Sequence, residues 1–245
     1  MDQIIGNSIV RLEVTDSTNN YAKQQIRENG LSEGTVFLAH EQTAGRGQQK
    51  NSWESEPGEN LLFSIVLCPD FLEIRRQFML SKVVALGIYK ALNKYVDSLK
   101  IKWPNDIYAG NQKLGGILIE NSVMSGLLKS AVVGIGLNVN QTLFPAGLIT
   151  AVSIKQATGK TLVPVVAAQE LCECLENRYQ QLQQRTASLL PEYNRVLYKA
   201  GEQVKLRTSE KVIETQIVGV KENGLLRTVD ETNRFFRFGE VEWIR

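Results

Sequence analysis

The spacing of apolar residues changes from segment to segment along this chain, and it predicts where strands and helices lie. Residues 61–67 are apolar except for Ser64 and have the length of a strand, which indicates a buried strand. Residues 77–96 place apolar side chains at helical spacing on one broad face, which predicts the clearest helix. Similar patterns predict further strands at residues 9–14, 35–41, 100–103, 113–120 and 129–136, and helices at residues 19–28, 152–158, 165–185 and 190–198.

The pattern becomes purely strand-like after Gly201. Alternating residues predict strands at residues 203–206, 212–220, 225–229 and 234–238, with a hairpin turn at Asn223-Gly224. The sequence therefore predicts an α+β protein in two parts. We expect a mixed β-sheet with helices packed on one side over residues 1–198, and a small β-barrel over residues 199–245.

The composition is that of a globular protein, with 43% hydrophobic and 22% charged residues in a chain of 245. A formal net charge of +2 argues against a surface that coats nucleic acid. No apolar run reaches the roughly 18 residues that a membrane span needs, and Met1-Asp2-Gln3 does not open a signal peptide. Three cysteines favour reduced thiols in a cytoplasmic protein, and a single histidine, His40, excludes a metal site built from several histidines.

Residues 42–58 form a long polar loop between two predicted strands. The loop contains Gly45-Arg46-Gly47, whose backbone amides and guanidinium suit a bound phosphate or carboxylate. A solvated turn has the same composition, so the tripeptide alone leaves both interpretations open. Because long loops inside compact domains are usually functional or mobile, we predict that this loop is poorly ordered until a ligand binds.

A second group of polar residues surrounds the strand predicted at residues 113–120. Lys102-Trp103-Pro104-Asn105-Asp106 forms a corner made rigid by proline, and Lys113 then begins a strand that contains Gly115-Gly116. The lysines supply positive charge and the glycines let a ligand approach the backbone, which together predict a bound anion. An Asx turn is the alternative for the corner, and a β-bulge is the alternative for Gly134-Ile135-Gly136-Leu137-Asn138.

Taken together, these segments resemble the biotin protein ligases. The resemblance rests on residues 41–53, on residues 102–106 with 113–120, on Ser17-Thr18-Asn19 and on residues 134–138, and the closing residues 238–245 also match. It implies the fold of the biotin and lipoyl ligases, with an SH3-like barrel at the C-terminus. It further implies an enzyme that joins biotin to ATP in the presence of Mg²⁺, giving biotinyl-5′-AMP, and then transfers biotin to a lysine of a biotin carboxyl carrier protein.

The resemblance also implies roles for particular residues. Lys113 and Arg46 are expected to be catalytic, because the carboxylate and the phosphate that it attacks are both anions. Biotin is expected to contact Ser17, Thr18, Asn19, Gln42, Arg46, Gly47, Gln48, Lys113, Gly116, Leu118 and Gly134. The ATP or adenylate is expected to contact Gly45, Arg46, Trp53, Lys102, Asn105 and Asn138, with Asp106 as the ligand of Mg²⁺.

Two departures from that family pattern carry further expectations. Only sixteen residues precede Ser17, so we expect neither an N-terminal helix-turn-helix domain nor DNA binding. Gln48 stands where many relatives have an arginine that retains the adenylate, so retention would fall to Arg46, Lys50 or Asn51. Replacing Lys50 with alanine should then speed leakage of the adenylate, and an unchanged release rate would rule this out.

Two other functions remain compatible with these motifs. A lipoate or octanoate ligase would use a similar fold and a carrier lysine, and a biotin-sensing regulator would bind the same ligands without releasing pyrophosphate. The sequence leaves open the identity of the carrier, the choice between a monomer and a homodimer, and the base that deprotonates the acceptor lysine. It also leaves open whether the barrel helps to hold ATP, docks the carrier or only adds stability.

Overall fold

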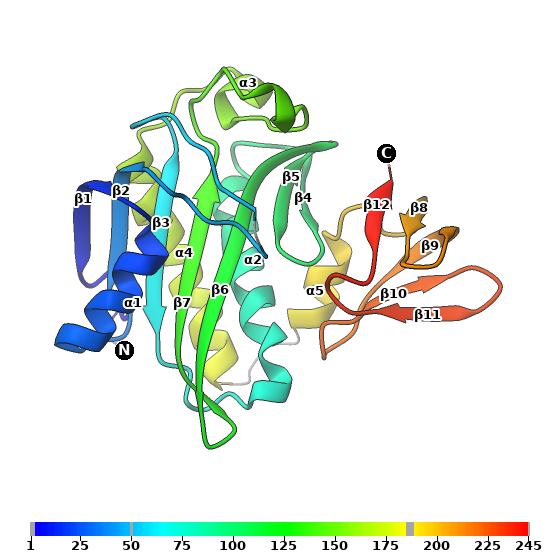
Figure 1. Cartoon of the computed structure of the whole chain (residues 1–245), viewed down its shortest axis with the longest axis horizontal. Coiled ribbons are helices and arrows are strands. Elements are labelled where there is room, and N and C mark those ends of the chain that lie inside the picture. Colours follow the sequence, from blue (N-terminus) through cyan, green and yellow to red (C-terminus); the bar gives the residue numbers. More distant parts are fainter. Residues whose placement is uncertain (1–2, 50, 185–188, 245) are drawn as a thin grey trace.

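Two β-sheets organise the computed structural model, which describes residues 3–49, 51–184 and 189–244 (Figure 1). The larger sheet has seven strands, in the spatial order β1 (Ile9–Thr15), β2 (Val36–Gln42), β3 (Leu61–Leu67), β7 (Leu127–Leu137), β6 (Gln112–Met124), β5 (Asp106–Ala109) and β4 (Leu99–Lys102). β1 and β2 are parallel, and the other neighbouring strands are antiparallel. The mixed sheet predicted from the sequence is thus confirmed.

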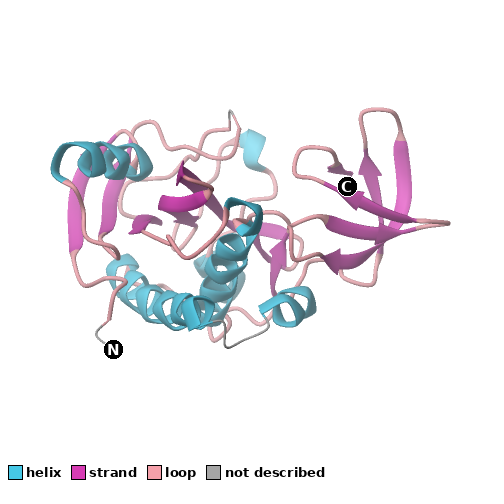
Figure 2. Cartoon of the chain, turned by 90° about the horizontal axis from the view of Figure 1, so that it is seen from below, coloured by secondary structure: helices cyan, strands magenta, loops and turns pink. Residues whose placement is uncertain are grey.

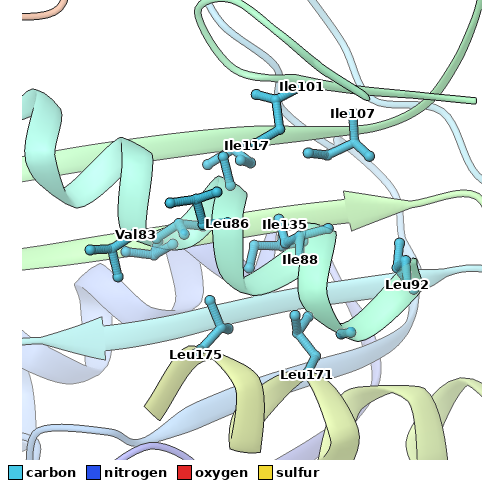
Figure 3. Packing of buried hydrophobic residues seen from close by; sticks show 14 of the residues in the cluster. Val83, Leu86, Ile88, Leu92, Ile101, Ile107, Ile117, Ile135, Leu171 and Leu175 are labelled. Atoms are coloured by element: carbon cyan, nitrogen blue, oxygen red, sulfur yellow. The ribbon is translucent and has the colours of Figure 1, made fainter. Parts of the chain in front are cut away.

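The helices that accompany this sheet are α1 (Thr18–Asn29), α2 (Phe78–Leu92), α3 (Ile154–Thr158), α4 (Pro164–Gln184) and α5 (Leu189–Arg195), with 3-10 turns at Ile74–Arg76 and Ala146–Leu148. The long helices α2 and α4 pack against each other on one face, where Leu86, Leu171 and Ile135 belong to one buried cluster (Figure 3). The position of the first helix differs from the sequence-based expectation, which placed all helices on one side of the sheet. α1 packs on the opposite face, with Ala22 against Phe37, because the central strands are apolar on both faces.

The smaller sheet has five antiparallel strands, in the order β11 (Asn233–Phe236), β10 (Leu226–Val229), β9 (Val212–Val220), β8 (Gln203–Arg207) and β12 (Glu242–Ile244). It lies beyond α5, beside the end of the larger sheet that carries β4 and β5 (Figures 1 and 2). Leu206, Ile217 and Leu226 join the same buried cluster as the larger sheet, so the two parts share a continuous core. The predicted small β-domain is confirmed, and its boundary at residue 199 stays a prediction.

Two strands of the structure are absent from the sequence prediction. The last three residues of β5 are all buried, so its side chains do not alternate, and β12 has only three residues, too few to display an alternating pattern. A turn at Ser125-Gly126 joins β6 to β7, with positive φ angles of 51° and 80°. The helix predicted at residues 165–185 is present as α4, although Arg185 lies outside the described residues.

Two expectations from composition can be compared with the structure. Among the described residues, no helix is both long enough and apolar enough to cross a membrane. All three cysteines are free, and burial raises the pKa of Cys172 to about 12, which keeps this thiol protonated.

A buried lysine connects helix α2 to the smaller sheet. Lys82 of α2 is 0% exposed, and its ammonium donates hydrogen bonds to the carbonyl oxygens of Lys221 (3.1 Å) and Glu222 (3.2 Å) in the turn that follows β9. The Trp103 indole N–H donates to the carbonyl of Gly224 in the same turn, at 2.8 Å. Burial lowers the pKa of Lys82 from its ordinary 10.5 to about 8.

We expect Lys82 to make the protein more stable as the pH rises from about 8 to 10.5. The penalty for burying the charge is fully present below pH 8, whereas within this window the folded chain has released a proton that the unfolded chain still binds. The free energy of unfolding of the wild type, measured in urea at about pH 7.5 and about pH 9.5, should therefore rise relative to that of Lys82→Met. An equal difference at both pH values would contradict the assignment.

Candidate active site

A cavity of about 830 Å³ lies where the larger sheet meets the smaller one. Its wall is formed by the start of α1, the loop after β2, strands β6 and β7, the corner at residues 102–106, and parts of the smaller sheet. Most of the residues expected at the site line it: Ser17, Thr18, Asn19, Gln42, Arg46, Gly47, Gln48, Trp53, Lys102, Asn105, Asp106, Lys113, Gly116, Leu118 and Gly134.

Gly45 and Asn138 are the expected site residues that the structure does not place on this wall. The Gly45 carbonyl accepts a hydrogen bond from the Trp53 amide at 2.9 Å, and a Cβ at Gly45 would lie 2.3 Å from the Trp53 carbonyl oxygen. Asn138 is buried, and its amide donates to the carbonyl of Val152 at 3.2 Å. These contacts pack both residues against neighbouring chain, and their expected contact with the ATP or adenylate stays a prediction.

Uncharged hydrogen-bonding groups form one end of the cavity. Gln42 Oε1 accepts hydrogen bonds from the backbone N–H (2.7 Å) and the hydroxyl (3.0 Å) of Thr18. Ser64 Oγ lies 2.7 Å from both Thr18 Oγ1 and Asn19 Oδ1. Ser17 occupies the N-cap position of α1, yet its side chain makes no capping hydrogen bond. Mutual hydrogen bonds thus orient these groups before a polar, uncharged ligand group arrives.

Ser64 belongs to this network although the sequence pattern did not single it out. It is fully buried in β3, where every other residue is apolar. Because a buried hydroxyl requires hydrogen-bond partners, a lone serine in an apolar strand is the signal that could have located it. Its partners on α1 are distant in the sequence, so they emerge only from the fold.

Each of the two expected catalytic cations is paired with a carboxylate. The Arg46 guanidinium lies 3.0 Å from Glu120 Oε1, and Lys113 Nζ lies 2.8 Å from Asp106 Oδ1. All four side chains are only partly exposed, with Asp106 at 21% and Lys113 at 35%. The carboxylates hold the cations in place, so an arriving anion would have to replace a carboxylate as the partner of each cation.

Glu120 joins the uncharged end of the cavity to the cationic end, and no role was expected for it. Burial by itself raises the pKa of Glu120, but hydrogen bonds from Lys23, Asn19 and Arg46 outweigh burial and hold the pKa below its ordinary value. Lys23 lies 2.9 Å from Glu120 Oε1, and the Asn19 amide donates to Glu120 Oε2 at 2.9 Å. Glu120 is therefore ionised at neutral pH and positions Asn19 and Arg46 together.

Trp53 rests on a surface that glycines keep flat. A Cβ at Gly136 would lie 2.5 Å from the Trp53 ring, and a Cβ at Gly116 would lie 3.4 Å from it. Lys113 Nζ lies 5.9 Å from the centre of the ring. The indole N–H is buried and has no hydrogen-bond partner within the described part of the chain.

The loop after β2 has hydrogen bonds of its own. The Gly47 amide donates to the carbonyl of Asn51 at 2.7 Å, and Arg46 pairs with Ser52 as an isolated antiparallel bridge. Gln48 and Asn51 both line the cavity. Lys50 lies outside the described residues, so the expected leakage from Lys50→Ala stays a prediction, as does disorder of the loop in the absence of ligand.

The smaller sheet contributes residues that no motif had assigned to the site. Residues 207–209 and 238–243 line the cavity, and the Arg207 guanidinium lies 2.8 Å from Glu242 Oε2. At the corner of residues 102–106, the Asn105 amide donates to the carbonyl of Ile117 at 2.9 Å and fixes the corner against β6. The Trp103–Pro104 peptide bond at this corner is cis. The cavity therefore belongs to both parts of the chain.

Comparison with known proteins defines the class to which this fold and cavity belong. Residues 12–138 match the biotin/lipoate A/B protein ligase family. The chain is 32% identical over 224 residues to the biotin–[acetyl-CoA-carboxylase] ligase of Paracoccus denitrificans, an alignment that covers 86% of this chain and 90% of that protein. The chain belongs to the biotin/lipoate A/B protein ligase family.

Further relatives differ in how much of their length this chain covers. The chain is 36% identical over 183 residues to the bifunctional ligase/repressor BirA of Bacillus subtilis, covering 72% of this chain and 55% of that protein. It thus spans about half the length of such relatives. A biotin protein ligase from Aquifex aeolicus, solved in complex with biotin and ATP, matches with a TM-score of 0.82 at 28% identity, over 98% of this chain and 99% of that one.

Proposed function

We propose that this protein is a biotin protein ligase, which activates biotin with ATP and transfers it to a lysine of a biotin carboxyl carrier protein. The observation that carries the proposal is a single cavity with an uncharged hydrogen-bonding end and a cationic end. Biotin has the same division, with a neutral ureido head and a carboxylate tail. The names of the Paracoccus and Aquifex relatives support this choice within the family.

The ureido head would bind at the uncharged end. Ser17, Thr18, Asn19 and Gln42 supply donors and acceptors there, and a buried polar head needs such partners. Gly134 leaves room beside them, because a Cβ at this position would lie 2.3 Å from Asn19 Oδ1. The tail would then extend along β6 and β7 towards Arg46 and Lys113, in the remaining part of the cavity.

In the first step, an oxygen of the biotin carboxylate attacks the α-phosphorus of ATP. The new P–O bond forms as the bond from the α-phosphorus to the β-phosphate oxygen breaks, and pyrophosphate leaves with that electron pair. Two anions must meet, so positive charge at the point of reaction lowers the barrier. Arg46 and Lys113 supply that charge by turning from Glu120 and Asp106 towards the ligand anions.

Mg²⁺ would enter this site together with ATP. Magnesium usually binds through one or two carboxylates and the substrate phosphates, and Asp106 on the cavity wall suits that mode. The described residues contain no cluster of three or more histidine, cysteine or acidic side chains that could hold a metal by themselves. The ion would supply charge neutralisation at the phosphates, and Asp106 becomes available to it when Lys113 moves to the anion.

In the second step, the amine of the acceptor lysine attacks the acyl carbon of biotinyl-5′-AMP. An amide bond forms, the mixed anhydride bond breaks, and AMP leaves as the amine loses its proton. Water would compete for the same carbon, so the loop at residues 42–58 must shield it. The described part of this loop already lies on the cavity wall through Arg46, Gly47, Gln48 and Trp53.

Incubation of a carrier domain with this protein, biotin and MgATP tests the proposal. Mass spectrometry should show one added biotinyl group, which disappears when the acceptor lysine is replaced with arginine. In parallel, ATP–pyrophosphate exchange is measured with biotin, lipoate and octanoate as the acid. Exchange supported only by lipoate or octanoate would indicate a lipoate-type ligase, and biotin binding without pyrophosphate release would indicate a sensor.

A further inference from the structure

The ammonium of Lys102 lies among three aromatic rings. Its Nζ is 4.8 Å from the ring centre of Tyr108, 5.3 Å from that of Trp243 and 5.9 Å from that of Tyr198. Nζ also donates a hydrogen bond to the Tyr108 hydroxyl at 3.1 Å. We call Tyr108, Tyr198 and Trp243 the Lys102 cage. Lys102 and Trp243 both line the cavity, so the cage borders the proposed reaction site.

The Lys102 cage is assembled from separate parts of the chain. Tyr108 belongs to β5 beside Lys102, Tyr198 follows α5, and Trp243 lies in β12 of the smaller sheet. The rings also contact one another, with centres 5.0 Å apart for Tyr108 and Tyr198 and 5.8 Å apart for Tyr198 and Trp243. The Tyr198 hydroxyl donates to Asn111 Oδ1 at 2.9 Å, which fixes the middle ring.

A cage of this kind fits a cation that must bind an anion. An aromatic face attracts an ammonium through its quadrupole and carries no net charge, so the positive charge still attracts a phosphate. A lysine side chain has much rotamer freedom to lose when it binds, and a cage that already orders it reduces that cost.

We propose that Tyr198 and Trp243 are positioning residues that hold Lys102 for the phosphates of ATP. This gives the smaller sheet a defined task in the nucleotide step, which it performs through Lys102. The inference rests on the proposed ligase function. It differs from simple stabilisation of the fold, because it predicts a selective effect on ATP and a dependence on Lys102.

The test compares Trp243→Ala, Trp243→Phe and Tyr198→Ala, each with Lys102 present and in a Lys102→Met background. Biotin-dependent ATP–pyrophosphate exchange gives KM for ATP, KM for biotin and kcat. Phe235→Ala is the matched control, because Phe235 lies in the same sheet, outside the cavity lining, with Lys221 Nζ 4.8 Å from its ring. The unfolding temperature of every variant is also measured, since Trp243 packs against the core.

With Lys102 present, Trp243→Ala should raise KM for ATP roughly tenfold, the factor implied by loss of one such ring contact. The KM for biotin should stay unchanged. Trp243→Phe should keep the KM for ATP close to the wild-type value, and Phe235→Ala should behave as the wild type. In the Lys102→Met background, neither Trp243→Ala nor Tyr198→Ala should add to the KM for ATP.

Two results would overturn the inference. One is an equal rise in the KM for ATP when Trp243 or Tyr198 is replaced, whether or not Lys102 is present. The other is a parallel rise in the KM values for biotin and ATP. If Trp243→Ala is unfolded, the KM for ATP of Tyr198→Ala and Trp243→Phe, with and without Lys102, provides the same test. A wild-type protein that catalyses no exchange would instead contradict the proposed function, so the two failures are distinguishable.

Discussion

Replacement of Lys113 with alanine should lower kcat for biotin-dependent pyrophosphate exchange by about 10² to 10³-fold, as for other removed charge-stabilising groups. The change removes a cation from the point where two anions meet. It also leaves Asp106 without the lysine that lies 2.8 Å away, so a negative charge faces the incoming anions. The loss should appear in the chemical step, because both effects act on the transition state.

The structure supplies controls for that experiment. Lys129 on β7 is exposed and is not among the cavity residues, so Lys129→Ala should keep wild-type exchange. Lys113 and Asp106 form a partly exposed pair, and such pairs usually contribute only about 0–1 kcal/mol to stability. The Lys113→Ala protein should therefore unfold near the wild-type temperature. A kcat within a few-fold of the wild type would rule out a catalytic role for Lys113.

Replacement of Gly134 with alanine should weaken biotin binding about ten- to a hundredfold, since steric overpacking typically costs about 1–3 kcal/mol. The added Cβ would lie 2.3 Å from Asn19 Oδ1. Asn19 cannot move aside cheaply, because its amide donates to Glu120 at 2.9 Å and its oxygen lies 2.7 Å from Ser64 Oγ. Displacement of Asn19 would disturb the uncharged end of the cavity as a whole.

Isothermal titration calorimetry with biotin alone measures this effect without the complication of turnover. Gly147→Ala provides the control, since a Cβ at Gly147 would meet no atom within 4 Å and Gly147 is not on the cavity wall. This variant should bind biotin as the wild type does. Unchanged affinity of Gly134→Ala for biotin would show that the ureido head does not bind beside Asn19.

Short sequence motifs are sufficient to locate most of the residues that line the cavity. The corner at residues 102–106 and the strand that begins near Lys113 meet on one wall, because β5 pairs with β6 over Ile107 and Gly115. The same reasoning placed Asn138 at the adenylate, which stays a prediction, whereas in the structure its amide donates to the carbonyl of Val152. A motif states which residue types occur together, whereas the direction of each side chain depends on the strand register.

Three features of the structure could not be predicted from the sequence pattern. Ser64 and Glu120 acquire their roles only when β3 and β6 lie beside α1. The position of α1 on the second face follows from strands that are apolar on both sides, and such strands do not indicate which helix covers which side. The Lys102 cage needs Trp243 from the last strand, and β12 is too short to be recognised by its period.

By itself, the sequence determined the order of the helices and of all strands except β5 and β12, the division into two parts and the segments that carry the chemistry. It could do so because periodicity, turns and glycine-rich motifs act over a few neighbouring residues. Only the tertiary structure decided which of these segments meet, which cation pairs with which carboxylate, and how the smaller sheet closes the cavity. Those contacts join residues far apart in the chain, so they depend on packing of the whole molecule rather than on any local preference.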